Sequence, residues 1–142
     1  MTKGERACAE ARDWIGTPYR HQASCKGAGT DCLGLIRGIW RALYGEEPLR
    51  LPAYTADWSE ASGREVLLDM ARGLLVPAGV EPAIGDILIF RMRRGSVAKH
   101  LGVVSATGAA AQFIHAYSGH GVIETHLTLP WQRRVAARLA LP

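Results

Sequence analysis

Apolar residues recur at helical spacing near the start of the chain. Thr2 and Glu5 have the spacing of a capping box, and the apolar positions from Ala7 to Ile15 then form one stripe. This pattern predicts a first helix, which the Gly-Thr-Pro sequence at 16–18 closes. A polar, glycine-rich loop is expected over 20–29.

A second helix is predicted over about 30–44, with Gly45 as its stop. Its apolar positions are spaced to face a core. Gly34 and Gly38 are poor helix formers, and they lie four residues apart. Their spacing predicts that another part of the chain packs closely against this helix.

The pattern changes in the second half of the chain. An extended loop is expected over 46–61, and Ser62 and Glu65 then repeat the capping-box spacing before a third helical pattern. After Leu75 come short β-rich runs divided by Gly or Pro, at 84–92, 100–107, 112–118, 122–127 and 133–141. Helices followed by an antiparallel sheet indicate an α+β fold, and the length fits a single domain over 1–142.

Composition and charge argue against several classes of protein. The chain is 48% hydrophobic and 21% charged with a formal net charge of +4, which is not the composition of a disordered segment. It has two Phe and no basic run interleaved with aromatic residues, so we expect no nucleic-acid binding. No stretch approaches the roughly 20 apolar residues that span a bilayer, so we expect no membrane insertion.

Two features bear on the compartment. The first 14 residues contain no apolar core of a signal peptide, so we expect synthesis in the cytoplasm without one. The chain has three cysteines, an odd number, and we expect them to be reduced thiols rather than a disulfide framework.

Cys32 is the residue that points most directly to chemistry. It falls in the first turn of the second predicted helix, where free backbone N–H groups and the helix dipole stabilise a thiolate. We therefore expect its pKa to lie below the ordinary value of about 8.5. The same N–H groups can hold an oxyanion during acyl transfer. For an isolated cysteine a small buried hydrophobe is the simpler interpretation, but two histidines favour the chemical one.

These histidines, His100 and His115, fall on consecutive predicted strands. If residues 107–108 form a two-residue hairpin turn, the two lie directly opposite each other on one face of the sheet. A longer loop that includes 109–111 would shift this register. The arrangement suits a general base and a partner that fixes its tautomer. The alternative for His115 is a half-buried strand histidine.

Five short motifs follow one another in an order that resembles a known enzyme family. In chain order they are GTPYR at 16–20, TDCLGLI at 30–36, GDILIF at 85–90, HLGVV at 100–104 and FIHA at 113–116. The chain resembles the NlpC-type peptidoglycan endopeptidases, the NlpC/p60 group of papain-like cysteine peptidases. It is most similar to their short form from phages and gene transfer agents, and the resemblance extends over about 11–127.

The resemblance implies a papain-like α+β domain, in which a helix that bears the nucleophile packs on an antiparallel sheet that bears two histidines. Cys32 would be the nucleophile, His100 the base and His115 the orienting residue. Tyr19 would line the cleft, and a core or loop tyrosine is the alternative. Asp31 would bind the amine or amide end of the substrate, and a helix N-cap is the alternative.

The resemblance also implies a substrate and a place of action. The favoured bond joins γ-D-glutamate to diaminopimelate in the peptidoglycan stem peptide, and no metal or cofactor is required. The family's usual residue after the nucleophile is Ser, whereas here it is Leu33, which argues against strict recognition of a free N-terminal L-alanine. The assembled substrate lies beyond the inner membrane. We therefore expect a phage-like particle to carry the protein, with tail proteins as partners, and activity in the periplasm or cell wall.

Other interpretations remain open. The same scaffold would suit an acyltransferase or amidase, and a structural tail component would bind cell wall without cutting it. Residues 45–80 lengthen the gap between Cys32 and His100 and would form a lid or a docking surface. The basic loop from Arg91 to Lys99 is either a solvated loop or a surface that attracts the stem-peptide carboxylates. The spacing of Cys25 and Cys32 is not usual for zinc ligands.

Overall fold

A computed structural model describes residues 1–48, 54–58 and 60–142. Its helices are α1 (Lys3–Asp13), α2 (Cys32–Tyr44), α3 (Val66–Leu74) and α4 (Leu129–Arg134), with short 3-10 turns at Glu60–Ser62 and Gly108–Ala110. A small hairpin pairs β1 (Ser24–Cys25) with β2 (Gly29–Thr30). The remaining strands are β3 (Val76–Pro77), β4 (Ile87–Phe90), β5 (His100–Ala106), β6 (Gln112–Tyr117), β7 (Gly121–His126) and β8 (Val135–Ala140).

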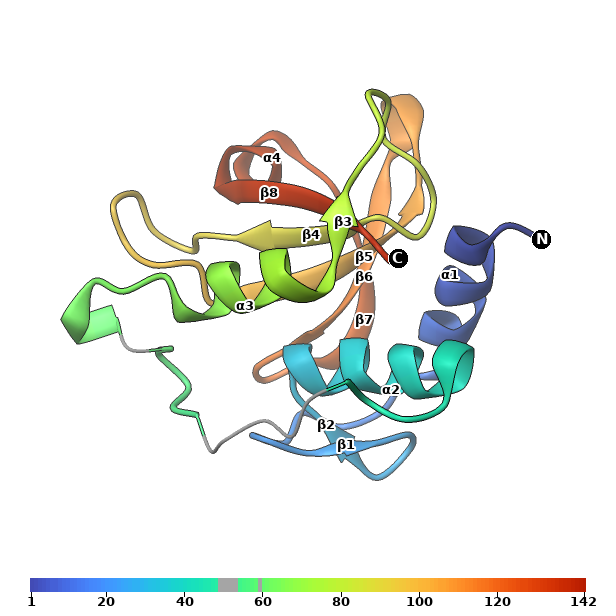
Figure 1. The fold of residues 1–142 in the computed structure, drawn as a ribbon, viewed down its shortest axis with the longest axis horizontal. Coiled ribbons are helices and arrows are strands. Elements are labelled where there is room, and N and C mark those ends of the chain that lie inside the picture. The colour runs from blue at the N-terminus through green and yellow to red at the C-terminus, as the bar shows by residue number, and fades with distance from the viewer. Residues whose placement is uncertain (49–53, 59) are drawn as a thin grey trace.

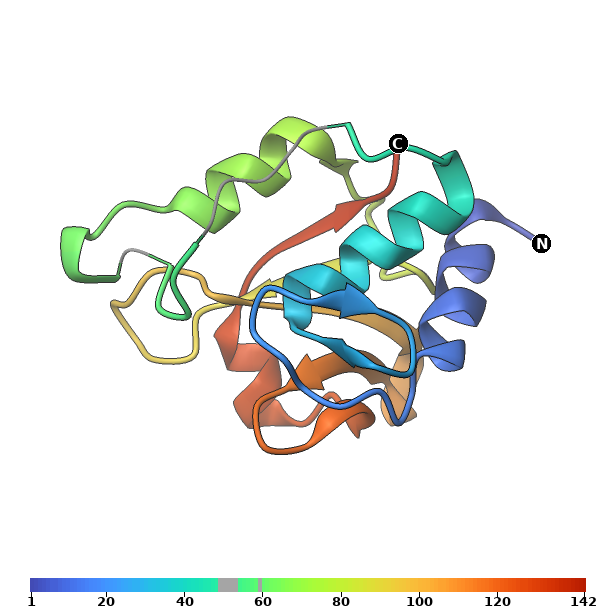
Figure 2. The same ribbon diagram turned by 90° about the horizontal axis from the view of Figure 1, so that it is seen from below.

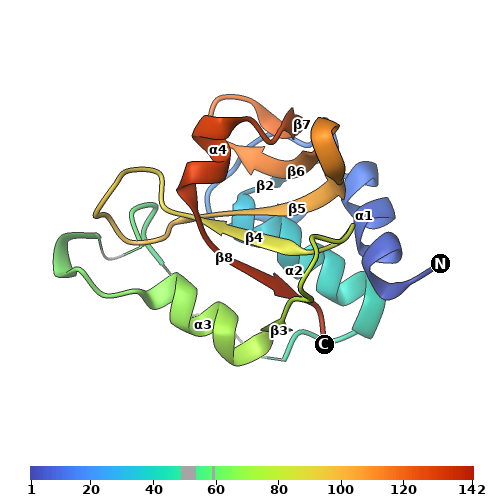
Figure 3. The ribbon, with the colours of Figure 1, turned by 90° about the horizontal axis from the view of Figure 1, so that it is seen from above.

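The strands β3 to β8 form one antiparallel sheet in the order β3-β8-β4-β5-β6-β7. In Figures 1 and 3, α2 lies against one face of this sheet and α4 lies on the other face. Figure 2 shows the β1–β2 hairpin next to the N-terminal part of α2. The predicted α+β class, with early helices packed on a late antiparallel sheet, is confirmed.

Each face of the sheet has its own apolar cluster. The larger cluster lies on the α2 side and combines helix residues such as Leu35 and Leu67 with strand residues such as Leu101 and Ile114. The smaller cluster lies on the α4 side and consists of Leu88, Phe90, Val104 and Phe113, against which Trp131 of α4 packs. Since both faces are covered, β4 is buried along its whole length, which explains its continuous apolar run.

The first two helices form where the sequence predicts them. Thr2 accepts a hydrogen bond from the backbone of Glu5, and the Glu5 side chain accepts one from the backbone of Thr2, which completes the capping box. The buried stripe ends at Trp14, because Ile15 is 43% exposed. Asp31 is the N-cap of α2 and Gly45 is its C-cap, at φ 90°, a conformation that favours glycine.

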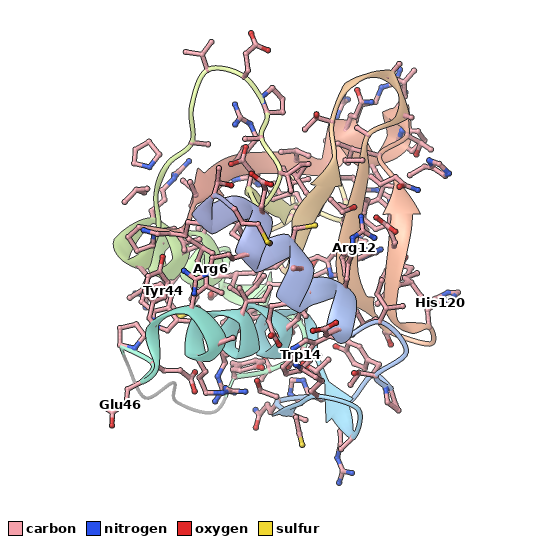
Figure 4. All side chains as sticks on the ribbon, turned by 90° about the vertical axis from the view of Figure 1, so that its right-hand side faces the viewer. Arg6, Arg12, Trp14, Tyr44, Glu46 and His120 are labelled. Carbon is pink, nitrogen blue, oxygen red and sulfur yellow. The ribbon has the colours of Figure 1, made fainter. Side chains whose placement is uncertain are left out.

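The close packing predicted at Gly34 and Gly38 is confirmed. A Cβ on Gly34 would lie 2.0 Å from the carbonyl oxygen of Ala23, and a Cβ on Gly38 would lie 2.1 Å from the indole ring of Trp14. Figure 4 shows Trp14 at the end of α1, beside α2. The two glycines therefore let the first helix and the small hairpin approach α2.

Replacing Gly38 by alanine is expected to lower the free energy of unfolding by about 2 kcal/mol, because the new methyl group collides with a buried and rigid indole. Gly73→Ala is the matched control. Gly73 is an exposed glycine of α3 with open space at its Cβ position, so this change should raise stability by up to about 1 kcal/mol. Urea unfolding of both variants checks the pair. Equal effects would contradict the packing described here.

Several predicted details differ in the structure. The loop expected over 20–29 contains the β1–β2 hairpin, and the β-rich run expected over 84–92 is a strand only over Ile87–Phe90. The capping box at Ser62 and Glu65 is wrong, because α3 begins one residue after Glu65 and has no side-chain cap. The Glu65 carboxylate instead binds Arg91 and the backbone N–H of Ala98. The last predicted strand is also too long, since its first residues, Arg133 and Arg134, belong to α4.

Part of the loop expected over 46–61 falls at 49–53 and 59, outside the described residues. Among the residues that are described, no helix has both the length and the apolar character to cross a membrane.

Candidate active site

The thiol of Cys32 lies at the start of α2, as the sequence predicts. Asp31 caps the helix by accepting a hydrogen bond of 2.7 Å from the backbone of Gly34. The Cys32 thiol donates to the carbonyl oxygen of Lys99, with 3.9 Å between sulfur and oxygen. Lys99 immediately precedes His100, so the helix start and the start of β5 meet at this point.

The expectation of a lowered thiol pKa is wrong for this conformation. Burial, and after it the negative charge of Asp31, raises the pKa of Cys32 to about 12. Backbone N–H groups of Leu101, Leu33 and Cys32 itself act in the opposite direction but are outweighed. The thiol is therefore neutral in this structure, and loss of its proton requires a base or a change in solvation.

Of the two connections left open between the histidine strands, the structure has the longer one, so the two-residue turn does not form. The 3-10 turn at Gly108–Ala110 lengthens the connection, and Val103 pairs with Ile114. In this register the two histidines do not lie directly opposite each other. The shift is two residues, and an even shift keeps every side chain on its original face. His100 and His115 consequently remain on one face as diagonal neighbours.

A chain of hydrogen bonds links these histidines to β7. The Nε2 atom of His100 lies 2.7 Å from Nδ1 of His115, and Nε2 of His115 lies 2.7 Å from the hydroxyl oxygen of Thr125. Burial lowers the pKa of His100 to about 3 and that of His115 to about 4, so both are neutral near pH 7. If His100 Nε2–H donates to His115 and His115 Nε2–H donates to Thr125, then Nδ1 of His100 carries no proton and can act as a base.

Thr125, which the sequence did not single out, ends this series of hydrogen bonds and would hold the His115 ring in place. Thr125→Val removes the hydroxyl but keeps the shape, and we expect it to lower kcat/KM about 2- to 10-fold, the effect of one lost hydrogen bond. Thr125→Ser should restore most of the activity. A steady-state assay of both variants checks the prediction, and identical losses would show that the side chain acts through packing alone.

Cys32 and His100 start neighbouring elements of the fold but are not hydrogen bonded to each other. Among the described residues, the Cys32 thiol makes no hydrogen bond to either histidine, and the His100 ring contacts Phe90 and Trp131 on the α4 side of the sheet. Leu101, the next residue, lies in the cluster beneath α2. Proton transfer from the thiol to His100 therefore requires the two side chains to come closer than they lie in this structure. Such contacts are often loose without substrate.

Tyr19 and Asp31, the two predicted substrate-binding residues, both lie beside the thiol. Burial raises the pKa of Tyr19 to about 12, with further contributions from Cys32 and Asp31. Asp31 is 2% exposed, and its second oxygen accepts from the backbone of Gln22 and from the Tyr54 hydroxyl. Binding an amine at Asp31 would therefore require Tyr54 to leave.

Part of the 45–80 segment extends across this site. Tyr54 binds Asp31 on the α2 side, and its ring stacks on Trp58 with 4.4 Å between ring centroids. Farther along, Glu60 binds Lys99 at 3.1 Å, next to His100. Figures 2 and 3 show the green segment that contains Glu60 near the yellow loop before β5. We call Tyr54, Trp58 and Glu60 the bridging residues.

Within the described residues, no three His, Cys, Asp or Glu side chains gather as they would around a metal ion. The three cysteines are free thiols, with Cys8 and Cys32 buried and Cys25 exposed.

Comparison with solved structures identifies the fold. The NlpC/p60 domain of the peptidoglycan hydrolase SagA is 22% identical, with a TM-score of 0.63, over 97% of this chain and 98% of that domain. The chain has the NlpC/p60 fold. NlpC1 from Trichomonas vaginalis is 23% identical, with a TM-score of 0.60, over 97% of this chain and 43% of that protein. An NLP/p60 family protein from Staphylococcus aureus is 18% identical, with a TM-score of 0.62, over 98% of this chain and 41% of that protein.

The chain thus spans less than half the length of the last two proteins and nearly all of the SagA domain. No protein-family model and no curated protein matches the sequence. These likenesses confirm the predicted papain-like α+β class of the NlpC/p60 fold. The roles of Cys32, His100, His115, Tyr19 and Asp31 remain predictions.

Proposed function

We propose that this protein is a peptidoglycan hydrolase, a cysteine endopeptidase with Cys32 as nucleophile. One observation carries the proposal: a hydrogen-bonded chain from Thr125 through His115 ends at His100, and the thiol at the start of α2 lies against the residue before that histidine. The proteins that share its fold include a peptidoglycan hydrolase. No metal or cofactor takes part in the proposed reaction.

The reaction begins when Nδ1 of His100 takes the proton of the Cys32 thiol. The thiolate attacks an amide carbonyl, and backbone N–H groups in the first turn of α2 stabilise the oxyanion. His100 then gives the proton to the leaving amine, which departs and leaves a thioester on Cys32. Water attacks the thioester with His100 as base, which releases the acid and restores the thiol. His115 holds the His100 ring in the required tautomer throughout.

We further propose that the bond cleaved joins γ-D-glutamate to diaminopimelate in the stem peptide. Mass spectrometry of muropeptides after incubation with the protein tests this. A freed amino group on diaminopimelate is the expected product. Transfer of the acyl group to another amine would favour an acyltransferase on the same scaffold, and binding without any product would favour a structural wall-binding component.

The bridging residues have to move before a substrate reaches the thiol, because Cys32 is only 6% exposed. We therefore expect iodoacetamide to label exposed Cys25 before Cys32. Tyr54→Phe removes the hydrogen bond to Asp31 and should speed labelling of Cys32 several-fold, about the effect of one hydrogen bond. Peptide mapping over time checks this, with the Cys25 rate as internal control. An unchanged Cys32 rate would show that Tyr54 does not hold the site closed.

The resemblance to the short phage and gene-transfer-agent form supports a proposed location. In this proposal a phage-like particle carries the protein with its tail proteins, and the protein acts on wall peptides in the periplasm during delivery of DNA. Purified particles should then contain the protein, and Cys32→Ala particles should assemble normally but deliver DNA poorly. Particles that lack the protein and deliver equally well would contradict this location.

A further inference from the structure

A groove on the α4 side of the sheet is lined by arginines. It has a volume of about 640 Å³ and lies between the loop after β4 and the end of α4. The arginines in its lining are Arg91, Arg93, Arg94, Arg133 and Arg134, and no described residue of the lining is acidic. We call these five residues and the cavity between them the arginine groove. It shares no residue with the proposed site at Cys32, Tyr19 and Asp31.

The first two arginines are held by carboxylates from outside the lining. Arg91 binds Glu65 at 3.1 Å, and Arg93 binds Glu60 at 2.7 Å. A backbone hydrogen bond of 2.8 Å from Arg91 to the carbonyl of Arg134 joins the two walls of the arginine groove. These contacts fix the walls and neutralise part of the charge.

The charges of the other three arginines are not balanced by a nearby carboxylate of any described residue. Arg94, Arg133 and Arg134 form no ion pair within the part of the chain that the structure describes. The Arg134 guanidinium lies over the ring of Trp131, 5.0 Å from its centroid, which limits its rotation. Several cations that converge on one cavity without a counter-ion raise each other's free energy, and a ligand with several negative charges would lower it.

We infer that the arginine groove binds the phosphate groups of an anionic polymer of the cell envelope. Guanidinium groups bind phosphate through paired N–H donors, and three unpaired guanidiniums suit neighbouring phosphates better than one isolated ion. That the polymer comes from the cell envelope rests on the proposed function, because a hydrolase of the wall meets such polymers. The binding itself does not depend on that function.

Nucleic acid is the less favoured polymer. Binding of single strands uses aromatic side chains as platforms on which bases stack. The described lining of the arginine groove contains no aromatic residue, and its uncharged members are Met92, Gly95, Pro130 and Val135. The indole of Trp131, which lies in α4 beside the lining, has the Arg134 guanidinium over its ring.

Titration of the protein with long-chain inorganic polyphosphate tests the inference. The probe variant is Arg94→Gln with Arg133→Gln, which removes two unpaired groove cations. We expect about tenfold weaker binding and a plot of log Kd against log salt that is shallower by about two. The control is Arg6→Gln with Arg72→Gln, which removes the same net charge from exposed positions on α1 and α3. Its affinity should change by less than about threefold.

Two outcomes would overturn the inference. Equal weakening in the probe and control variants would show that net charge alone attracts the polymer. Binding of a single-stranded oligonucleotide as tight as that of polyphosphate at matched charge would show a nucleic-acid site instead. Because both measurements concern binding, they give the same answer whether or not the protein hydrolyses peptidoglycan, so the two proposals can fail separately.

Discussion

Replacing His100 by alanine is expected to lower kcat/KM for a stem peptide by about 10⁴-fold or more, because no base then remains to take the thiol proton or protonate the leaving amine. His115→Ala should have a smaller effect, since His115 acts through His100. His115→Asn should recover part of that loss, because an amide oxygen can accept the hydrogen bond from Nε2 of His100. Steady-state assays of the three variants check this order.

The matched control is His126→Ala. His126 lies at the end of β7 and is exposed, so its removal changes the histidine count without touching the chain of hydrogen bonds. We expect its activity to stay within about twofold of the unaltered protein, as for most surface substitutions. If every substitution at His115 abolished activity as completely as His100→Ala, then His115 would have a chemical role of its own.

Mild acid is expected to destabilise the fold through the same two histidines. Their folded-state pKa values, about 3 and about 4, lie below the unfolded value of about 6.5. Below pH 6.5 the unfolded state therefore binds more protons than the folded state, and stability falls as pH falls. The loss should reach about 2 kcal/mol per histidine at pH 5, and no such change should occur above pH 7.

Urea unfolding at pH 7.5, 6.5 and 5.0 measures this loss. His115→Asn removes one of the two buried titrating groups, so its stability should fall about half as steeply between pH 6.5 and 5. His126→Ala again serves as control and should follow the unaltered protein. A variant curve that runs parallel to that of the unaltered protein would show that other groups are responsible for the acid sensitivity.

Local patterns predicted the helices well because each signal acts within a few residues. The capping box at Thr2 and the stop at Gly45 determine helix ends without help from the rest of the chain. The glycines at 34 and 38 even indicated a close neighbour. The capping box at Ser62 failed for the opposite reason, because the Glu65 carboxylate binds a loop distant in sequence.

The residues of the candidate site stay a prediction, and the structure differs from the sequence analysis in how they are arranged. The shared face of His100 and His115 follows from strand alternation, which survives a two-residue change in register. Burial of the thiol was left as an alternative, because it depends on packing between the start of α2 and the start of β5. Thr125 and Tyr54 were missed, since a single hydroxyl on a strand or in a loop carries no pattern.

In the proposed reaction, Cys32 performs acyl transfer on wall peptides. The most direct test of this step is the rate at which new amino groups appear when purified peptidoglycan is incubated with the protein, compared between Cys32→Ala and the control Cys25→Ala at matched folded content. We predict release at the unaltered rate by Cys25→Ala and none above background by Cys32→Ala. Equal release by the two variants would show that Cys32 is not the nucleophile.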